Sequence, residues 1–319
     1  MNKEGINVLS LFDGHSTGML ALIDANIKVN KYYASEIEEN AIKISKKNFP
    51  EIIHLGNINK IDLTKLPKID LILLGSPCQG FSRQGKGLNF KDPRSKLFFV
   101  ANDIIHWIKI NNNPNVKFLM ENVEMKKEWE NVISDKLGVK CISINSKLLS
   151  AQNRPRLYWS SEKIKLPQIK EQICLLDIID KNIDTSNYIE YKGLLLDSTI
   201  SKQQMELIDV VNGEVRIKQA VKKGYIIAKN GDGINLSFPT SKTRRGRVIK
   251  QKSNTLDTGC VGWVYYNNII RPFTIEELER LQTLPIGYTE GIDETDRKKL
   301  IGNGWTKNVI SFILKQYKF

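Results

Sequence analysis

The chain has 319 residues, of which 41% are hydrophobic, and it carries a net charge of +13. This length and hydrophobic fraction are enough for one large domain and a smaller one. No apolar run reaches the ~18 residues that span a bilayer, and the first residues lack a basic segment followed by a long apolar one, so we expect a cytoplasmic protein. A basic chain of this kind favours a polyanionic partner.

The four cysteines are widely scattered, and only three histidines accompany them. No two cysteines form a Cys-x-x-Cys pair. The spacing therefore indicates neither a disulfide framework nor a zinc site, and we expect no metal. The cysteines are Cys78, Cys141, Cys174 and Cys260.

The first 160 residues alternate between short apolar segments and segments of helical periodicity. The candidate strands are 6–12, 31–36, 52–58, 70–76, 116–123, 140–149 and 154–160. The candidate helices between them are 17–26, 38–49 and 95–110. Short strands separated by helices predict an α/β fold with a parallel, doubly wound sheet, whose ligands bind at the carboxyl ends of the strands.

After about Pro167 the chain breaks into short, weakly periodic pieces, up to about Asn268. Helical periodicity returns at 274–284 and 303–317. We interpret the chain as a large α/β domain, an inserted basic region and a C-terminal segment that returns to the first domain.

The positive charge is concentrated in the inserted region. From Arg216 to Lys252 there are eleven Lys or Arg residues against one acid, Asp232, which gives this window +10 of the total charge. Such a run is often only a solvated lysine-rich face. Here glycines and a proline interrupt it, which favours a looped surface in contact with phosphates.

Three strand ends together predict a nucleotide pocket. The first strand leads into the glycine turn Leu11 to Gly18, which by itself is as typical of plain structure as of a ligand site. The second strand ends in Glu36, where nucleotide-binding sheets place a carboxylate for the ribose hydroxyls. The third delivers Gly56, Asn57 and Ile58, which can flank an adenine. Because the turn lacks a pyrophosphate cradle, the pocket suits S-adenosylmethionine better than NAD.

Cys78 lies in the stretch "SPCQGFSRQGKG", after a strand and a proline and before a glycine-rich loop. A free cysteine is most often a small buried hydrophobe. As a nucleophile it needs nearby positive charge to form the thiolate, and Arg154 and Arg156, on one face of a later strand, can supply it. Glu121, at the end of another strand, can donate a hydrogen bond to a ring nitrogen if it is protonated.

The motifs "FDGHSTG", "SPCQGFS", "MENV", "QNRPR" and "IGNGW" resemble, in this order, those of DNA (cytosine-5)-methyltransferases. The first and last look especially like the branch of the de novo methyltransferases and their bacterial or phage relatives. The resemblance covers about 1–160 and 270–319. It implies a Rossmann-like S-adenosylmethionine-dependent methyltransferase fold in three parts: 1–160 as catalytic domain, 161–268 as an inserted target-recognition domain, and 269–319 returning to the catalytic domain.

The resemblance also implies a mechanism. Cys78 adds to C6 of a cytosine, Glu121 protonates or hydrogen-bonds N3, and C5 then takes the methyl group. Arg156 holds the cytosine O2, while Arg154 supports the site and the thiolate. Because the chemistry needs both faces of the ring, the base must be flipped out of the duplex, and the Gln79 to Lys91 loop closes over it.

The other functional residues are carried over from the motifs that match. The implied cofactor-binding residues are Phe12, Asp13, Gly14, Thr17, Gly18, Glu36, Ile37, Asn57, Ile58, Ser76, Pro77, Leu97, Asn303, Gly304 and Trp305. The implied DNA-binding residues of the loop after Cys78 are Gln79, Phe81, Ser82, Arg83 and Gln84. Two positions depart from the family pattern: many relatives have an aspartate where Asn57 stands, and the role of His15 stays open.

In the basic region we expect the arginines and the lysines to have different roles in binding DNA. At least one of Arg244, Arg245 and Arg247 reads a guanine in the major groove, and Thr255 contacts a phosphate. The lysines hold phosphates without reading sequence. These lysines are Lys222, Lys223, Lys250 and Lys252.

We therefore predict a monomeric enzyme that acts on double-stranded DNA with S-adenosylmethionine as cofactor, with or without a separate cognate restriction endonuclease. Three alternatives are a tRNA methyltransferase of related fold, a catalytically silent DNA-binding protein and a nicotinamide-dependent dehydrogenase. The long basic insertion and the single proline before Cys78 argue against the first. The set Cys78, Glu121, Arg154 and Arg156 argues against the second, and the missing diphosphate loop against the third.

Overall fold

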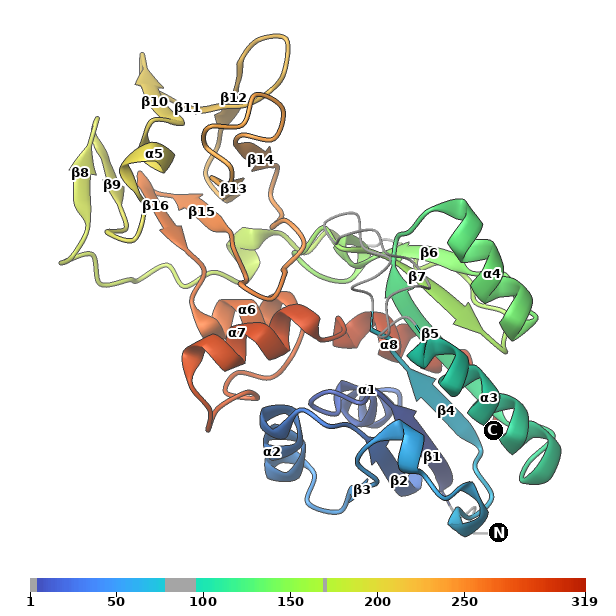
Figure 1. The fold of residues 1–319 in the computed structure, drawn as a ribbon. Helices are drawn as coiled ribbons and strands as arrows, with labels where there is room; N and C mark the ends of the chain where they lie inside the picture. Colours follow the sequence, from blue (N-terminus) through green and yellow to red (C-terminus); the bar gives the residue numbers. More distant parts are fainter. Residues whose placement is uncertain (1–4, 78–95, 169–170) are drawn as a thin grey trace.

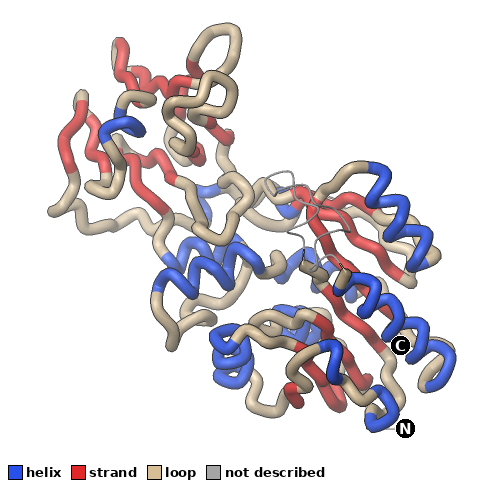
Figure 2. The backbone as a smooth tube through the Cα atoms, viewed as in Figure 1, coloured by secondary structure: helices blue, strands red, loops and turns tan. Residues whose placement is uncertain are grey.

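The computed structural model describes residues 5–77, 96–168 and 171–319. The chain forms two bodies, one built on a seven-stranded sheet and one that holds two further sheets (Figure 1). Helices cover the large sheet, whereas the second body consists almost entirely of strands and loops (Figure 2).

Six of the seven strands of the large sheet lie within the segments predicted from the sequence, and the second strand begins two residues before the predicted segment 31–36. The seven strands are β1 (Ile6–Leu11), β2 (Val29–Ser35), β3 (Ile53–His54), β4 (Leu71–Leu74), β5 (Lys117–Val123), β6 (Ile142–Asn145) and β7 (Pro155–Ser160). Their order is β3-β2-β1-β4-β5-β7-β6. The pairs from β3 to β5 are parallel, but β7 is antiparallel to both of its neighbours. The expected parallel sheet therefore holds for every strand except β7.

The sheet is buried on both faces, as the continuous apolar run of β4 predicts. Leu71 and Leu73 pack into the core on one face, while Ile72 and Leu74 pack into the core on the other. The helices of the large domain are α1 (Thr17–Asp24), α2 (Glu39–Asn48), α3 (Leu97–Asn111), α4 (Lys127–Leu137) and α8 (Lys307–Leu314). Apolar residues of α1, α2 and α8 belong to the first core, and those of α3 and α4 belong to the second. The sheet is thus doubly wound.

Besides the four-residue α5 (Lys202–Met205), two described α-helices were not among the predicted elements. One is α4, which buries only Trp129 and Ile133 against the sheet. The other is α7 (Glu294–Asn303), whose buried residues are confined to its last turn, at Leu300, Ile301 and Gly302. In α7 the apolar residues are too few to show a periodic stripe, so tertiary packing makes it helical. In α4 the residues Trp129, Val132, Ile133 and Leu137 do have helical spacing, and the prediction missed it.

The second body, called the small domain below, consists of a three-stranded sheet and a six-stranded sheet. Its elements are β8 (Ile189–Tyr191), β9 (Leu194–Leu196), α5 (Lys202–Met205), β10 (Ile208–Val211), β11 (Glu214–Lys218), β12 (Tyr225–Ala228), β13 (Asp232–Asn235), β14 (Arg247–Ile249), β15 (Trp263–Tyr266) and β16 (Ile269–Pro272). One apolar core, with Ile217, Ile234 and Trp263, joins the two sheets. The six-stranded sheet includes β16, which lies beyond residue 268.

The chain returns from the small domain to the large one through α6 (Ile275–Leu281), α7 and α8. A separate apolar core at this junction contains Leu256, Phe273, Leu278 and Ile301. The end of α8 then packs in the first core of the large sheet through Ile313. Among the described helices, none is long and apolar enough to cross a membrane.

At the junction between the two domains, Gly302 packs so closely against the backbone of Asp257 that a side chain would not fit. A Cβ atom there would lie 1.8 Å from the carbonyl oxygen of Asp257. Gly302→Ala should therefore force the two segments apart and destabilise the protein by about 1–3 kcal/mol. A thermal melt should show a lower Tm, whereas Thr295→Ala, at an exposed position of the same helix, should leave the Tm nearly unchanged. Equal melting temperatures for the two variants would contradict the tight contact.

Candidate active site

The residues predicted to bind the cofactor and the base gather at the carboxyl ends of β1, β2, β4 and β5. Parallel strands bring these ends to one edge of the sheet, where open α/β sheets bind ligands. Cys78 and the predicted loop residues Gln79, Phe81, Ser82, Arg83 and Gln84 lie outside the described residues. The geometry of the site therefore rests on the strands and turns that surround them.

Glu36 ties the ends of β1 and β2 together. Its Oε2 accepts a hydrogen bond from the backbone N–H of Gly14 at 2.8 Å. Its Oε1 accepts from the N–H groups of Ile37 and Glu38 at 2.7 and 3.0 Å. A carboxylate has about four acceptor positions, so one stays open on Oε2. To accept both ribose hydroxyls, Glu36 would have to exchange one of these backbone contacts.

Asp13 lies in a buried polar cluster beneath the turn. Its Oδ1 accepts from the Tyr32 hydroxyl at 2.7 Å, and its Oδ2 accepts from the Ser16 hydroxyl at 2.5 Å. Burial raises the pKa of Asp13 to about 6, against the effect of these hydrogen bonds, and the nearby charge of Glu36 acts in the same direction as burial. Near neutral pH the Asp13 carboxylate is therefore charged in a buried position, which costs electrostatic free energy, while its hydrogen bonds support the turn.

Apolar side chains surround this polar turn. Phe12 is half-buried and takes a left-handed conformation with φ of 58°, and Gly14 follows with φ of 61°. Ile37 is 68% exposed just after β2, whereas Ile58 is buried. Leu97, at the start of α3, is half-buried. An open apolar surface beside polar backbone groups can hold a planar, heteroatom-rich ring.

Trp305 connects this turn to Glu121. Its indole lies against the backbone at the end of β4, where a Cβ on Gly75 would be 2.9 Å from the indole nitrogen. Its Nε1–H donates to Oε2 of Glu121 at 3.2 Å. The sequence placed Trp305 in the cofactor site, and this second contact with Glu121 was not predicted.

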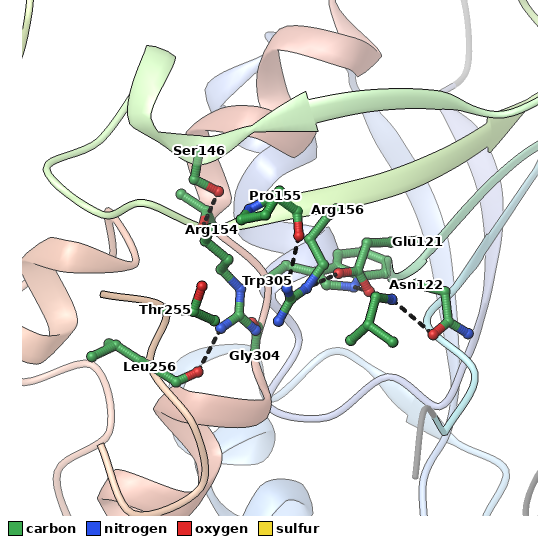
Figure 3. Close-up of polar contacts among 12 residues, drawn as sticks. Glu121, Asn122, Ser146, Arg154, Pro155, Arg156, Thr255, Leu256, Gly304 and Trp305 are labelled. Atoms are coloured by element: carbon green, nitrogen blue, oxygen red, sulfur yellow. Dashed lines mark hydrogen bonds and ion pairs between the residues drawn. The ribbon is translucent and has the colours of Figure 1, made fainter. Parts of the chain in front are cut away.

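Glu121 also pairs with Arg156. The Nε of Arg156 lies 3.0 Å from Oε1 of Glu121, and the two side chains are 12% and 13% exposed. Glu121 and Arg156 come from β5 and β7, which pair antiparallel. Figure 3 shows the carboxyl group held between the guanidinium and the indole. The sequence assigned both residues to the site but did not show that they touch.

Arg154 has different partners, although the sequence placed it on one face with Arg156. Its guanidinium is buried and donates to the carbonyls of Leu256, Gly302 and Gly304 at 2.8 to 3.0 Å (Figure 3). Of these carbonyls, that of Gly302 lies in the last turn of α7 and that of Gly304 at its C-cap, where a positive charge is favourable. Arg154 thereby joins the segment before β7 to the segment that carries Trp305.

Two buried amides complete the site, and the sequence analysis assigned neither of them. Asn122 is 1% exposed, and its Nδ2 donates to the backbone oxygen and the hydroxyl of Ser76. Gln152 is fully buried; it donates to the carbonyl of Leu281 and accepts from the N–H of Leu256. Both lie inside the quoted motifs "MENV" and "QNRPR". For Asn122 the available signal was a polar residue in the largely apolar strand β5, whereas Gln152 precedes β7 and offered no such signal.

His15 is also buried, at 2% exposure. Its Nδ1 contacts the Thr17 hydroxyl at 3.2 Å, and its ring packs edge-on against Tyr288. Burial lowers the pKa of His15 to about 4, so the ring is neutral at pH 7. This packing holds the turn against the C-terminal segment.

The basic region presents its predicted DNA-binding residues unequally. Arg244 is exposed, whereas Arg247 turns back and donates to the carbonyls of Thr243, Arg245 and Gly246. The Thr255 hydroxyl donates to the carbonyl of Asn153, which ties it to the catalytic motif.

The prediction that Lys252 holds a DNA phosphate is wrong. This side chain is 8% exposed, and its ammonium group donates to the carbonyls of Lys147, Ser150 and Ile173. Burial lowers its pKa. Lys252 anchors the small domain to the large one.

Within residues 5–77, 96–168 and 171–319, no group of three or more His, Cys, Asp or Glu side chains is placed to hold a metal ion. At the described edge of the sheet the structure places a carboxyl group, guanidinium groups and an indole N–H.

Comparison with known proteins identifies this arrangement. The profile described as C-5 cytosine-specific DNA methylase matches residues 6–318. The chain belongs to this family. It is a DNA cytosine-5 methyltransferase that depends on S-adenosylmethionine, and the predictions of family, fold class and enzyme class are confirmed.

Curated relatives agree over most of the chain. Type II methyltransferase M1.ScrFI of Lactococcus lactis subsp. cremoris is 29% identical over 297 residues, which cover 86% of this chain and 69% of the relative. Type II methyltransferase M.DsaV of Dactylococcopsis salina is 25% identical over 332 residues, which cover 99% and 87%. Orphan methyltransferase M.Rho11sI of Bacillus phage rho11s is 29% identical over 195 residues, which cover 59% of this chain and 36% of the relative.

Solved structures share the fold. The Entamoeba histolytica methyltransferase EhMeth superposes with a TM-score of 0.63 at 18% identity, and the match covers 98% of each chain. A DNMT2 mutant from Spodoptera frugiperda gives a TM-score of 0.60 at 19% identity, covering 97% of this chain and 98% of the other.

The indole N–H of Trp305 provides a first prediction for this site. Trp305→Phe keeps an aromatic ring beside Gly75 but removes the hydrogen bond to Glu121. Losing a hydrogen bond to a charged group should lower kcat about tenfold or more, with a smaller change in cofactor affinity. Methyl transfer to DNA and S-adenosylhomocysteine titration measure the two effects. The control is Trp107→Phe on α3, and a loss of affinity without a loss of kcat would contradict the contact with Glu121.

The raised pKa of Asp13 provides a second prediction. Between the ordinary value near 4 and the folded value of about 6, the folded protein holds a proton that the unfolded chain has lost. The stabilising contribution of Asp13 is therefore present at low pH and is lost as the pH rises through about 6. Asp13→Asn removes this dependence, so the Tm of the variant relative to the wild type should rise from pH 5 to pH 7. Asp135→Asn, on the exposed side of α4, controls for the removed charge. A Tm difference that stays constant over this range would contradict the assignment.

Proposed function

We propose that the enzyme methylates C5 of a cytosine flipped out of double-stranded DNA, through a covalent bond between the Cys78 sulfur and C6. The observation that carries this proposal is the Glu121 carboxyl group, held between Arg156 and Trp305 on β5. β5 pairs with β4, whose end leads through Pro77 to Cys78. Cys78 thus follows in the chain the strand that pairs with the one carrying Glu121, and a thiol and a carboxyl group suit addition to a ring and stabilisation of the same ring.

The Glu121 and Arg156 pair matches the polar edge of cytosine. Cytosine presents two neighbouring acceptors, O2 and N3. The Arg156 guanidinium donates to O2, and a protonated Glu121 donates to N3, so each partner exchanges its contact with the other for a contact with the base. Donation to N3 draws electrons from the ring and favours attack of the Cys78 thiolate at C6.

The remaining steps restore the base. After Cys78 adds to C6, C5 carries the electron pair that takes the methyl group. A base or water then removes the C5 proton, and Cys78 leaves by elimination, so the thiolate is regenerated. Arg154 acts indirectly by holding the segments that carry Arg156 and Trp305.

The pocket at the ends of β1 to β3 fits the cofactor. S-adenosylmethionine supplies an electrophilic methyl group on a positively charged sulfur when it is bound. The exposed Ile37, with Phe12 and Ile58, would flank the adenine, and Glu36 and Asn57 would face the ribose and the base edge. The other proposed contacts of the cofactor are those of the glycine turn, the end of β4 and the segment 303–305.

The small domain is proposed to select the DNA sequence. Residues 161–268 are proposed to form the target-recognition domain, whose six-stranded sheet β16 (Ile269–Pro272) completes, with Arg244, Arg245 and Thr255 at the DNA. Residues 1–160 and the rest of 269–319 are proposed to form the catalytic domain. We propose a monomer that acts in the cytoplasm on duplex DNA. The relatives include both type II and orphan methyltransferases, and the proposed reaction requires no bound endonuclease.

Trapping on a modified base tests the role of Cys78. Cytosines methylated by the wild-type enzyme in cells are first located by bisulfite sequencing. A duplex with 5-fluorocytosine at that position should then form a covalent complex in the presence of S-adenosylmethionine, because fluorine cannot leave C5 as a proton and elimination stalls. Cys78→Ala should abolish the complex and the methylation while still binding DNA.

Cys141→Ala is the matched control, since this thiol is half-buried away from the proposed site. Burial raises its pKa to about 12, so it should not react. A covalent complex that forms equally well with Cys78→Ala would overturn the assignment of the nucleophile.

A further inference from the structure

The loop between β13 and β14 presents an aromatic side chain under backbone strain. Phe238 is 53% exposed, more than the C-terminal Phe319 at 40%. Its φ is 57°, in the left-handed region that bulky residues rarely adopt, and a proline follows it. Strain of this kind costs about 1–3 kcal/mol and is concentrated at functional positions. The fold thus holds an apolar ring in solvent at an energetic cost.

Arg244 lies on this ring. The centre of its guanidinium is 4.6 Å from the ring centroid of Phe238, in the geometry of a cation–π contact. Among the residues that the structure describes, no carboxylate pairs with the Arg244 guanidinium, so its donors face solvent. The ring fixes the orientation of a planar group with unused hydrogen-bond donors.

A second pair in the small domain has the same contact but a different environment. The guanidinium of Arg216 lies 4.6 Å from the ring of Tyr225. It also pairs with the carboxylate of Glu214 at 2.8 Å, which occupies its donors. This comparison separates Arg244 from Arg216, because no carboxylate of the described residues pairs with the Arg244 guanidinium.

The loop itself is organised before any ligand binds. The Ser241 hydroxyl accepts from the N–H groups of Thr243 and Arg244, and Arg247 donates to three carbonyls of the loop. A Cβ on Gly246 would lie 2.1 Å from the carbonyl oxygen of Lys218, so the loop crosses closely over β11. Little conformational entropy is therefore left to lose on binding.

The same loop is coupled rigidly to the catalytic site. β14 forms the edge of its sheet opposite β8, on the side toward the large domain in Figure 1. Shortly after β14, Lys252 donates to the carbonyls of Lys147 and Ser150, and Ser253 pairs with Gln152. Gln152 precedes Arg154 and Arg156 in the chain. A base read by this loop therefore lies at a fixed offset from the cytosine that is methylated.

We propose that Phe238 and Arg244 form one base-reading unit: Arg244 donates two hydrogen bonds to guanine O6 and N7 in the major groove, and Phe238 packs on the methyl group of a neighbouring thymine. Guanine is the base that a guanidinium fork reads best, and the thymine methyl is the apolar group that the major groove offers. The proposal rests on the proposed DNA substrate. It names which bases are read and by which side chains.

The test begins with bisulfite maps of cells that express the wild type, Phe238→Ala, Arg244→Lys or the control Arg216→Lys. The wild-type map should contain a guanine next to a thymine. Arg244→Lys keeps the charge but loses the fork, and it should lower discrimination at the guanine about 5- to 100-fold. Phe238→Ala should relax the preference for the thymine, and Arg216→Lys should leave the map unchanged.

Removing single groups from the DNA then assigns each contact. With purified enzyme and the mapped duplex, replacing the thymine by uracil removes its methyl group and should slow the wild type several-fold but leave Phe238→Ala unaffected. Replacing the guanine by 7-deazaguanine should likewise slow the wild type but not Arg244→Ala. Phe238→Leu, which keeps an apolar contact, should retain part of the thymine preference.

Three outcomes would overturn the proposal. Unchanged maps for both Phe238→Ala and Arg244→Lys would place base reading elsewhere. A uniform loss of turnover on all sequences would make Phe238 a general DNA contact, and equal sensitivity of wild type and Phe238→Ala to uracil would exclude the methyl contact. A wild type that methylates no DNA cytosine would instead contradict the proposed function itself.

Discussion

The structure depends on the buried guanidinium of Arg154. The chain leaves the large sheet after β7, builds the small domain and must then return to complete the active site with Trp305. Arg154 donates to Leu256, on the way back, and to Gly302 and Gly304, at the end of α7. A buried charge is stable only when its donors are satisfied, so the three carbonyls have to come together around it. This requirement holds the segment that leads into the small domain against the segment that leads out of it.

The catalytic geometry follows from that junction. Because Gly304 is held by Arg154, the next residue, Trp305, lies against Gly75 and reaches Glu121. Across the antiparallel β5–β7 pair Arg156 lies opposite Val123, two residues along β5 from Glu121, and its guanidinium reaches the Glu121 carboxylate diagonally. Lys252 makes the same kind of contact farther from the active site, because its buried ammonium group donates hydrogen bonds to backbone carbonyls of both domains. The groups that act on the base and the loop proposed to read the DNA thus share one framework of buried cations and backbone carbonyls.

Much of the fold could be predicted from the sequence alone. The strands of the large sheet are short apolar runs, and runs such as Leu71 to Leu74 are buried on both faces wherever helices cover a sheet. The carboxyl ends of such strands meet at one edge, so Asp13, Glu36 and Glu121 could be assigned to a common site before their distances were known. The α7 helix could not be predicted in this way, because its few apolar residues carry no periodic signal. The α4 helix could have been, since Trp129, Val132, Ile133 and Leu137 have helical spacing.

What the sequence by itself determined is therefore the chemistry: a family of motifs, a doubly wound sheet, and the residue types that this reaction needs. What only the tertiary structure decided is which cation meets which partner. Arg154 and Arg156 are two residues apart, yet one binds carbonyls of the returning chain and the other binds Glu121. Lys252 and Arg244 belong to the same basic run, yet one is buried and the other is exposed on an aromatic ring. Local sequence does not specify these differences, because each depends on carbonyls, rings and carboxylates supplied by segments distant along the chain or by the folding of a loop.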